Sequence, residues 1–212
     1  MEEQRRWRGR QRRIGLTGGI ATGKSTVGRL LQEHFGLPVL DADLFAREAL
    51  APGSAGAQAV LARYGPQVKA ADSPEAGAAA IDRPALGRIV FADPAERRWL
   101  EQLVHPLVRE RFRQELEQRA EASALVLMIP LLFEAGLESL CSEVWLVDCD
   151  EARQQQRLIH RDGLPADEAR CRIEAQWPLE RKRALADRII DNCDSVDDLL
   201  GRLKLALSGY VR

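Results

Sequence analysis

The chain of 212 residues has no long apolar run and almost no net charge, and each absence excludes a class of protein. Its longest apolar run, residues 124–133, is too short to cross a bilayer and contains Pro130. The net charge is −1, from 31 basic and 32 acidic residues, so no overall field attracts nucleic acid or a membrane surface. We therefore expect a small-molecule partner, with neither nucleic acid nor membrane bound.

Motifs for metal, redox or secretory function are also missing. The cysteines are Cys141, Cys149, Cys171 and Cys193. None has CxxC spacing, so we expect reduced thiols without a chemical role. The three histidines form no cluster with metal-ligand spacing, and no Gly-x-Ser-x-Gly motif occurs, which excludes zinc and hydrolase chemistry. The N-terminal segment lacks the apolar stretch of a secretory signal, so a cytoplasmic enzyme is expected.

Short apolar segments alternate with helical patterns along much of the chain. Strand patterns occur at 13–16, 38–40, 125–129, 144–147 and 188–190. Because these strands are apolar throughout, they indicate a parallel sheet that helices cover on both faces. The sequence therefore predicts an α/β fold of three layers around a five-stranded parallel sheet.

Two segments fall outside this alternation. Residues 1–12 carry five arginines around Trp7, and we interpret them as a disordered basic tail, with a nucleic-acid-binding arm as the alternative. Residues 44–122 have helical periodicity and no clear strand, which predicts a helical insertion. The nucleotide-binding core would then comprise residues 13–43 and 123–212.

Residues 18–25 form the most informative stretch, because Gly-Gly-Ile-Ala-Thr-Gly-Lys-Ser follows a strand pattern and precedes a helical one. Glycines allow successive backbone N–H groups to face inward, and the helix adds the positive end of its dipole. Lys24 can reach the β- and γ-phosphate oxygens, and the Ser25 hydroxyl can bind a bridging Mg²⁺. We therefore expect a P-loop that binds a nucleoside triphosphate. Its contacts would be Gly18, Gly19, Ile20, Ala21, Thr22, Gly23, Lys24, Ser25 and Thr26.

Two carboxylates, Asp41 and Asp43, directly follow the second strand pattern. Ligands of open parallel sheets bind beyond the carboxyl ends of the strands, so both side chains should face the phosphates. Asp43 is our candidate for the general base that takes a proton from an acceptor hydroxyl, and either aspartate, Asp41 in particular, can hold Mg²⁺ through water. Capping of the helix that begins near Leu44 is the alternative role for Asp41.

The third strand pattern ends in Pro-Leu-Leu-Phe-Glu, residues 130–134, and not in the aspartate of a usual Walker B strand. Metal binding would then depend on Ser25, the two aspartates and water. Glu134 becomes a candidate for an outer-shell contact to the metal or for a substrate contact, with a surface position at a helix start as the alternative.

Arginines recur every four residues after the fourth strand pattern, at Arg153, Arg157 and Arg161. A charge run alone usually marks a solvated helix face. On a mobile element beside a triphosphate, however, arginines can neutralise the transferred phosphoryl group and exclude water. We therefore predict a helical lid over about residues 150–180. The 44–122 insertion is a candidate site for the acceptor, with a purely structural cap as the alternative.

Together these motifs resemble the dephospho-coenzyme A kinase family, relatives of the nucleoside monophosphate kinases. The matching segments include the P-loop, Asp41-Ala42-Asp43, Ala46-Arg47-Glu48, Ile81-Asp82-Arg83, His105-Pro106, Pro130-Leu131-Leu132-Phe133-Glu134, Gln156-Arg157-Leu158, Arg172-Ile173 with Gln176, and Asp191-Asn192. The P-loop alone would admit many kinases, but its combination with the Asp-Ala-Asp, His-Pro and Pro-Leu-Leu-Phe-Glu segments is specific.

The resemblance implies transfer of the ATP γ-phosphoryl group to the ribose 3′-hydroxyl of dephospho-coenzyme A, the last step of coenzyme A biosynthesis. By the same resemblance, Asp43 is the base, Lys24 and Arg157 are catalytic, and residues 44–122 form the coenzyme A domain. Mg²⁺ would be the cofactor, and ATP and dephospho-coenzyme A the partners.

Further binding residues follow from the same likeness. Nucleotide contacts would include Arg157, Arg161 and Asn192. Acceptor contacts would include Asp41, Asp43, Arg47, Arg83, His105 and Glu134. From its apolar neighbours alone, His105 is instead expected to be a hydrogen-bonded structural residue.

Ala21 stands where the family's loop more commonly has glycine. Alanine tolerates helical backbone angles, so we expect little effect on the chemistry.

Two other classes of function stay open. Another small-molecule or nucleotide kinase would differ in its acceptor, and a non-catalytic nucleotide- or nucleic-acid-binding protein would show steep salt dependence with DNA or RNA.

Overall fold

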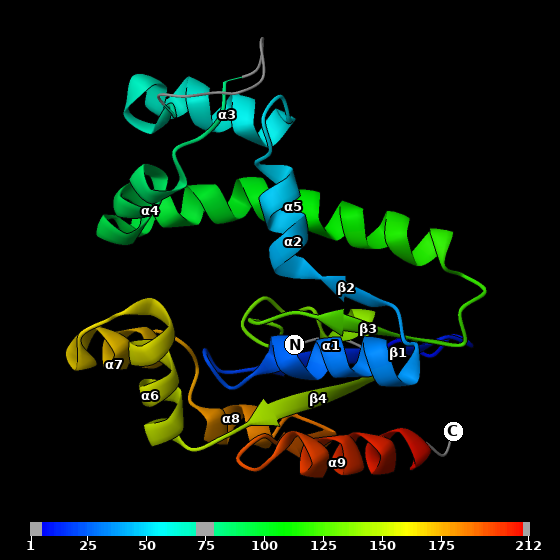
Figure 1. The fold of residues 1–212 in the computed structure, drawn as a ribbon. Coiled ribbons are helices and arrows are strands. Elements are labelled where there is room, and N and C mark those ends of the chain that lie inside the picture. The colour runs from blue at the N-terminus through cyan, green and yellow to red at the C-terminus, as the bar shows by residue number, and fades with distance from the viewer. Residues whose placement is uncertain (1–5, 71–78, 210–212) are drawn as a thin grey trace. The chain divides into compact units, whose positions relative to one another are not determined.

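A computed structural model describes residues 6–70 and 79–209 of the chain. The chain divides into two compact units, which are drawn in Figure 1. The first, here called the core unit, comprises Met1–Asp41 and Glu121–Arg212. The second, called the inserted unit, comprises Ala42–Ala120, close to the segment 44–122 expected as an insertion.

The core unit contains one sheet of five parallel strands. They are β1 (Arg12–Gly18), β2 (Val39–Asp41), β3 (Ala124–Met128), β4 (Glu143–Asp148) and β5 (Arg188–Asp191), in the spatial order β2-β3-β1-β4-β5. Each strand lies within two residues of its predicted range. The α/β fold with a five-stranded parallel sheet is therefore confirmed.

Helices of the core unit lie between its strands in the chain, and one helix follows the last strand. They are α1 (Lys24–Phe35), a short 3₁₀ turn (Glu138–Leu140), α6 (Glu151–Asp162), α7 (Ala166–Glu174), α8 (Leu179–Arg183) and α9 (Val196–Ser208). Side-chain oxygens of Asp150 and Ser195 accept backbone N–H groups at the starts of α6 and α9. Gly36 and Gly163, both with left-handed backbone angles, end α1 and α6.

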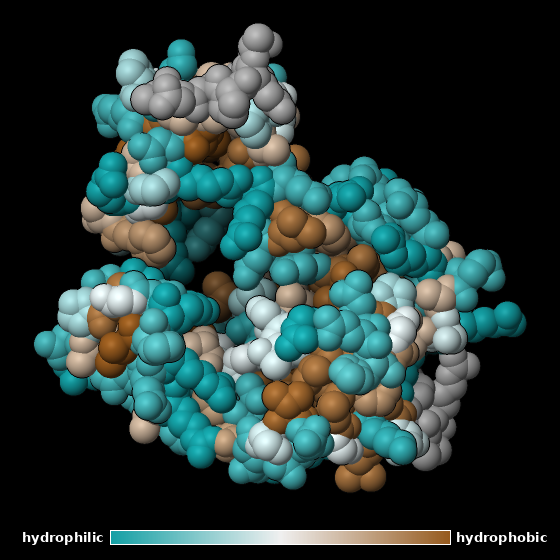
Figure 2. All heavy atoms as spheres, viewed as in Figure 1, coloured by the Kyte–Doolittle hydropathy of each residue, from teal (hydrophilic) through white to brown (hydrophobic). Residues whose placement is uncertain are grey.

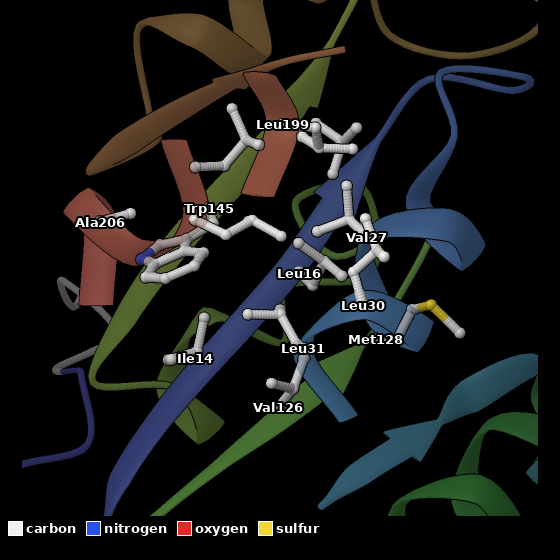
Figure 3. Close-up of a cluster of buried hydrophobic side chains, with 13 residues drawn as sticks. Ile14, Leu16, Val27, Leu30, Leu31, Val126, Met128, Trp145, Leu199 and Ala206 are labelled. Carbon is white, nitrogen blue, oxygen red and sulfur yellow. The ribbon is translucent and has the colours of Figure 1, made fainter. Parts of the chain in front are cut away.

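Apolar side chains on one face of the sheet pack against α1 and α9, as Figure 3 shows. The strands contribute Ile14, Leu16, Val126, Met128, Trp145, Val147 and Ile190. The helices contribute Val27, Leu30, Leu31, Leu199, Leu203 and Ala206. Each fully buried leucine of such a core contributes about 1.5–3 kcal/mol through the hydrophobic effect, so this packing fixes the end of β1 from which the P-loop starts.

A buried carboxylate joins β1, β4 and α9 at the opposite end of the sheet. Glu143 Oε1 accepts from Arg12 Nε at 2.5 Å, and Glu143 Oε2 accepts from Trp145 Nε1 at 2.9 Å. Arg12 also donates to the carbonyl oxygen of Leu207 in the last turn of α9. Because the buried charge is paired on both oxygens, it does not carry the cost of an isolated ion.

The inserted unit is helical. It contains α2 (Ala42–Ala49), α3 (Ala55–Tyr64), a 3₁₀ turn (Gly65–Val68), α4 (Arg83–Ala92) and α5 (Pro94–Gln118). Leu50, Val60, Val68, Leu86 and Val90 form its buried cluster. Between its helices, a single antiparallel bridge joins Lys69 to Ile81. Within the described residues, this unit therefore has its own apolar core and no named strand.

Part of the expected tail is attached to the core unit. The backbone N–H of Trp7 donates to the carbonyl oxygen of Cys141 at 2.9 Å, and the Arg13 guanidinium lies 3.5 Å from the centre of the Trp7 ring. Arg6 pairs with Asp187 at 2.6 Å. The prediction of disorder over residues 1–12 therefore does not describe residues 6–12, because a stacked tryptophan and an ion pair hold them. Residues 1–5 lie outside the described part of the chain.

Hydrophilic residues predominate on the face drawn in Figure 2, where hydrophobic residues also reach the surface. Among the described residues, no helix is both long and apolar enough to span a membrane.

Candidate active site

The predicted P-loop connects β1 to α1 in the core unit. Gly23 has φ of +96°, and a Cβ at this position would collide with the Asn192 amide, so glycine is required there. The Lys24 ammonium donates to the carbonyl oxygens of Gly18 at 3.2 Å and Gly19 at 2.9 Å. Ser25 lies exposed in the first turn of α1. The sequence therefore places a cation and a hydroxyl at the helix N-terminus that phosphates favour.

Ala21 adopts a φ of +58°, in the left-handed region. Right-handed helical backbone angles were expected at Ala21 from the sequence, and that expectation was wrong. The left-handed conformation costs an alanine about 1 kcal/mol relative to glycine, because its Cβ crowds the backbone. Contacts from outside the loop must offset that strain.

Arg157 on α6 supplies such contacts. Its Nη1 donates to the carbonyl oxygens of Ala21 at 3.3 Å and Thr22 at 3.1 Å, and its Nη2 donates to that of Asn192 at 2.9 Å. The Asn192 Nδ2 also donates to the Thr22 carbonyl oxygen at 2.7 Å. The structure thus brings Arg157 and Asn192 to the P-loop, where both bind backbone oxygens.

Cys149 lies beside this arginine, with its sulfur 3.9 Å from Arg157 Nη1. Burial raises the pKa of the Cys149 thiol to about 11. The raised pKa favours the protonated thiol near neutral pH, so the absence of a chemical role for Cys149 stays a prediction.

Asp41 lies at the end of the sheet where the strands have their carboxyl ends, and the P-loop starts from that same end. Asp41 is paired with Met128 on β3, and Met128 is paired with Leu16 on β1. Asp43 belongs to the inserted unit, where it lies exposed in the first turn of α2. A carboxylate in that turn interacts favourably with the helix dipole.

Glu134 makes contacts within the core unit. Its Oε1 lies 2.7 Å from the ammonium of Lys182, which is fully buried, and 3.3 Å from the backbone nitrogen of Trp177, which donates to it. The Lys182 contact is an ion pair outside hydrogen-bond geometry, and Glu134 Oε2 is buried without a hydrogen-bond partner among the described residues. One oxygen of Glu134 thus holds the segment after α7, and its role toward a substrate stays a prediction.

The remaining predicted arginines and the histidine have exposed positions: Arg47, Arg83, His105, Arg153 and Arg161. Arg161 pairs with Asp162 at 2.7 Å, and Arg153 pairs with Asp150 at 3.1 Å. In the inserted unit, Arg83 donates to the carbonyl oxygen of Arg47 at 2.9 Å. His105 is exposed on α5, which corrects the expectation of a structural histidine drawn from its apolar neighbours.

Sequence reasoning assigned no role to two glutamines that contact the P-loop. Gln154 donates to the carbonyl oxygen of Ile20, and Gln176 accepts from the Ile20 N–H. Gln176 stands in a segment that matches the family, which was the available signal. Gln154 gave none, because its contact joins residues 134 positions apart.

The oxygen atoms near the P-loop could bind a divalent cation only together with water and the phosphates of a nucleotide. Among the described residues, no group of three or more His, Cys, Asp or Glu side chains is placed to hold a metal. Mg²⁺ in phosphoryl-transfer sites is bound by one or two protein oxygens together with water and substrate phosphates. Ser25 and Asp41 offer such oxygens, so Mg²⁺ would bind here only with the nucleotide.

Comparisons with known proteins agree with this geometry. Residues 12–198 match the family model described as dephospho-CoA kinase. The dephospho-CoA kinase of Synechococcus sp. (strain CC9605) is 66% identical over 182 residues, which are 86% of this chain and 85% of that protein.

Solved structures show the same likeness. TT1252 from Thermus thermophilus is 37% identical, with a TM-score of 0.77, and the match covers 96% of this chain and 100% of that one. Dephospho-CoA kinase from Campylobacter jejuni is 25% identical, with a TM-score of 0.63, over 94% of this chain and 97% of that one. The chain belongs to the dephospho-CoA kinase family.

Proposed function

We propose that Lys24, Ser25 and Asp43 carry out the reaction of this family, the ATP-dependent phosphorylation of dephospho-coenzyme A in coenzyme A biosynthesis. The acceptor atom is the ribose 3′-hydroxyl oxygen, and the products are coenzyme A and ADP. One observation carries the proposal: a P-loop, with its lysine and serine, lies within the segment that matches the family.

Lys24 stabilises the negative charge on the β- and γ-phosphate oxygens. In the structure its ammonium is bound by two loop carbonyl oxygens, and phosphate oxygens would replace them as stronger, charged acceptors. Ser25, and Asp41 through water, would hold Mg²⁺, which would supply further positive charge toward the same oxygens.

Asp43 accepts the proton of the 3′-hydroxyl. The hydroxyl oxygen then bonds to the γ-phosphorus while the bond from that phosphorus to the bridging oxygen breaks, and the electron pair leaves with ADP. Two features support Asp43: it follows the end of β2 by two residues, and it is exposed. Asp41, directly at the strand end, is the next candidate.

Arg157, Arg161 and Asn192 bind the nucleotide in this proposal, and the 44–122 insertion binds the acceptor through residues such as Arg47, Arg83 and His105. The separate apolar core of the inserted unit supports an independent binding role for it. Dependence on Mg²⁺, a cytoplasmic location, and ATP and dephospho-coenzyme A as partners, with neither nucleic acid nor membrane bound, belong to the same proposal.

An acceptor panel tests the function. Purified protein would be incubated with ATP, Mg²⁺ and a set of hydroxyl acceptors, with each product detected by mass. We expect a phosphorylated product from dephospho-coenzyme A at a kcat/KM at least tenfold above that for any nucleoside monophosphate or sugar. Preference for another acceptor would assign the chain to a different kinase activity, and steep salt-dependent binding of DNA or RNA without transfer would favour a binding protein.

A further inference from the structure

Ile20, in the middle of the P-loop, is held on both sides by glutamine side chains. Gln154 Nε2, from α6, donates to the Ile20 carbonyl oxygen at 2.7 Å. The Ile20 N–H donates to Gln176 Oε1, from the segment after α7, at 2.8 Å. Gln154 is 2% exposed, so its amide has little access to solvent. We call this pair of contacts the Ile20 clasp.

The clasp fixes the orientation of two successive peptide groups. In a trans peptide, the C=O of one residue and the N–H of the next point in opposite directions. A carbonyl of Ile20 that is turned toward Gln154 therefore directs the Ala21 N–H to the opposite side. Phosphate binding by a P-loop requires such N–H groups on its inner side, so the clasp favours the anion-binding shape.

The neighbouring carbonyl oxygens are held in the same manner. Those of Ala21 and Thr22 accept from Arg157, as described above. Three consecutive carbonyl oxygens, from Ile20 to Thr22, thus have side-chain donors from α6. Since Ala21 is held at a φ of +58°, the loop needs these contacts more than a loop with glycine there would.

Both glutamines are themselves fixed by packing. A Cβ on Gly19 would come within 2.5 Å of Gln154 Nε2, so the loop backbone approaches that amide closely. The residue after Gln176, Trp177, donates its backbone N–H to Glu134, which pairs with the buried Lys182. The segment that carries the Gln176 acceptor is thereby tied to the turn that follows β3, through Glu134.

We propose that Gln154 and Gln176 are positioning residues for ATP binding, which act by holding the Ile20 peptide in the phosphate-binding conformation. This proposal rests on the proposed function, because it assumes that the loop binds ATP. It assigns helix α6, which falls in the predicted lid segment, a second task besides carrying arginines, since Gln154 and Arg157 approach the loop from the same helix.

Neutral variants test the clasp. Gln154→Met and Gln176→Met keep the side-chain length but remove the donor and the acceptor, respectively. We expect each to weaken the binding of a non-hydrolysable ATP analogue by on the order of tenfold, the effect of about one lost hydrogen bond. The KM for ATP should rise in parallel, while kcat at saturating ATP and the Tm change little. Gln156→Met, at an exposed glutamine of the same helix, is the matched control and should bind as the wild type does.

Charged variants add a test of hydrogen-bond direction. Gln154→Glu and Gln176→Glu place one negative charge beside the same peptide. A glutamate at 176 still accepts a hydrogen bond from the Ile20 N–H. A glutamate at 154 has no donor, so its negative charge repels the Ile20 carbonyl oxygen. We therefore expect Gln154→Glu to weaken analogue binding at least tenfold more than Gln176→Glu. If Gln154→Met does not fold, the half-exposed Gln176 decides the question through its Met and Glu variants.

Three results would overturn the clasp: wild-type affinity in both Met variants, an equal loss in Gln156→Met, or a loss of Tm with unchanged affinity in the folded fraction. Analogue binding is measured without any acceptor. A wild-type protein that binds the analogue but does not phosphorylate dephospho-coenzyme A would therefore contradict the proposed function and leave the clasp intact.

Discussion

Arg157 Nη1 donates a hydrogen bond to the carbonyl oxygen of Thr22 over 3.1 Å, and this contact joins helix α6 to the P-loop. An arginine predicted to neutralise phosphate charge is thus also a donor to backbone oxygens. Its planar group reaches three of them at once, which a lysine ammonium cannot do in the same geometry.

We therefore predict that Arg157→Lys lowers kcat/KM for ATP by about 10- to 100-fold, since charge is kept and the planar donor set is lost. The Tm should change by no more than about 3 °C, because the contacts lie at a loop and not in the core. Steady-state kinetics and thermal unfolding check both parts. A large fall in Tm with normal turnover in the surviving fraction would make Arg157 a purely structural residue.

Lys24→Ala should lower kcat by on the order of a hundredfold or more while leaving the fold intact, because a charge that stabilises the transferred phosphoryl group is lost. Ser25→Ala should reduce activity severely as well. Lys204→Ala, at an exposed lysine on α9, is the control and should keep wild-type kcat. Near-normal turnover in a folded Lys24→Ala protein would contradict the P-loop assignment.

Asp43→Asn should leave ATP binding close to normal and lower phosphoryl transfer by roughly 10²- to 10⁴-fold, because asparagine keeps the shape but lacks a basic oxygen. Asp41→Asn should have a milder effect if it acts through metal-bound water. Kinetics with dephospho-coenzyme A, together with separate nucleotide titrations, distinguish the two. An Asp43→Asn enzyme within tenfold of the wild type would move the base to Asp41.

Because two of its thiols are buried, we predict that the protein loses stability at alkaline pH. Burial raises the pKa of Cys141 to about 12 and that of Cys149 to about 11, above the ordinary value. The folded chain then keeps these protons to higher pH than the unfolded chain. Their contribution to stability is complete below about pH 9, the ordinary thiol pKa, and is lost as the pH rises toward 11–12.

Urea denaturation at several pH values from 8 to about 10.5 measures this effect. The free energy of unfolding should fall over that range, and a Cys141→Ala/Cys149→Ala variant should show a shallower slope. Equal slopes in the variant and the wild type would show that other groups cause the alkaline loss.

The strands and the P-loop were predictable because their signals are local. Apolar residues throughout a short segment indicate a buried strand, and the glycines, Lys24 and Ser25 occupy adjacent positions. The order β2-β3-β1-β4-β5 is not contained in such patterns, since it depends on which strands pair across the whole unit.

The side chains that hold the P-loop were not predictable either, because their contacts join residues far apart in the sequence. Gln154 and Gln176 reach Ile20 across 134 and 156 residues, and no periodicity records a contact of that kind. The attachment of Trp7 to Arg13 and Cys141 was missed because composition describes a basic segment and not its packing. The exposure of His105 likewise depends on which face of α5 packs within the inserted unit.

The central claim is that this chain phosphorylates the ribose 3′-hydroxyl of dephospho-coenzyme A. Its most direct test is phosphorus and proton NMR of the product formed from ATP, Mg²⁺ and dephospho-coenzyme A by the purified protein. We predict a new phosphomonoester signal coupled to the ribose 3′ proton, formed in equal amount with ADP. A phosphate at another position, or ADP and inorganic phosphate without any phosphorylated acceptor, would contradict the account.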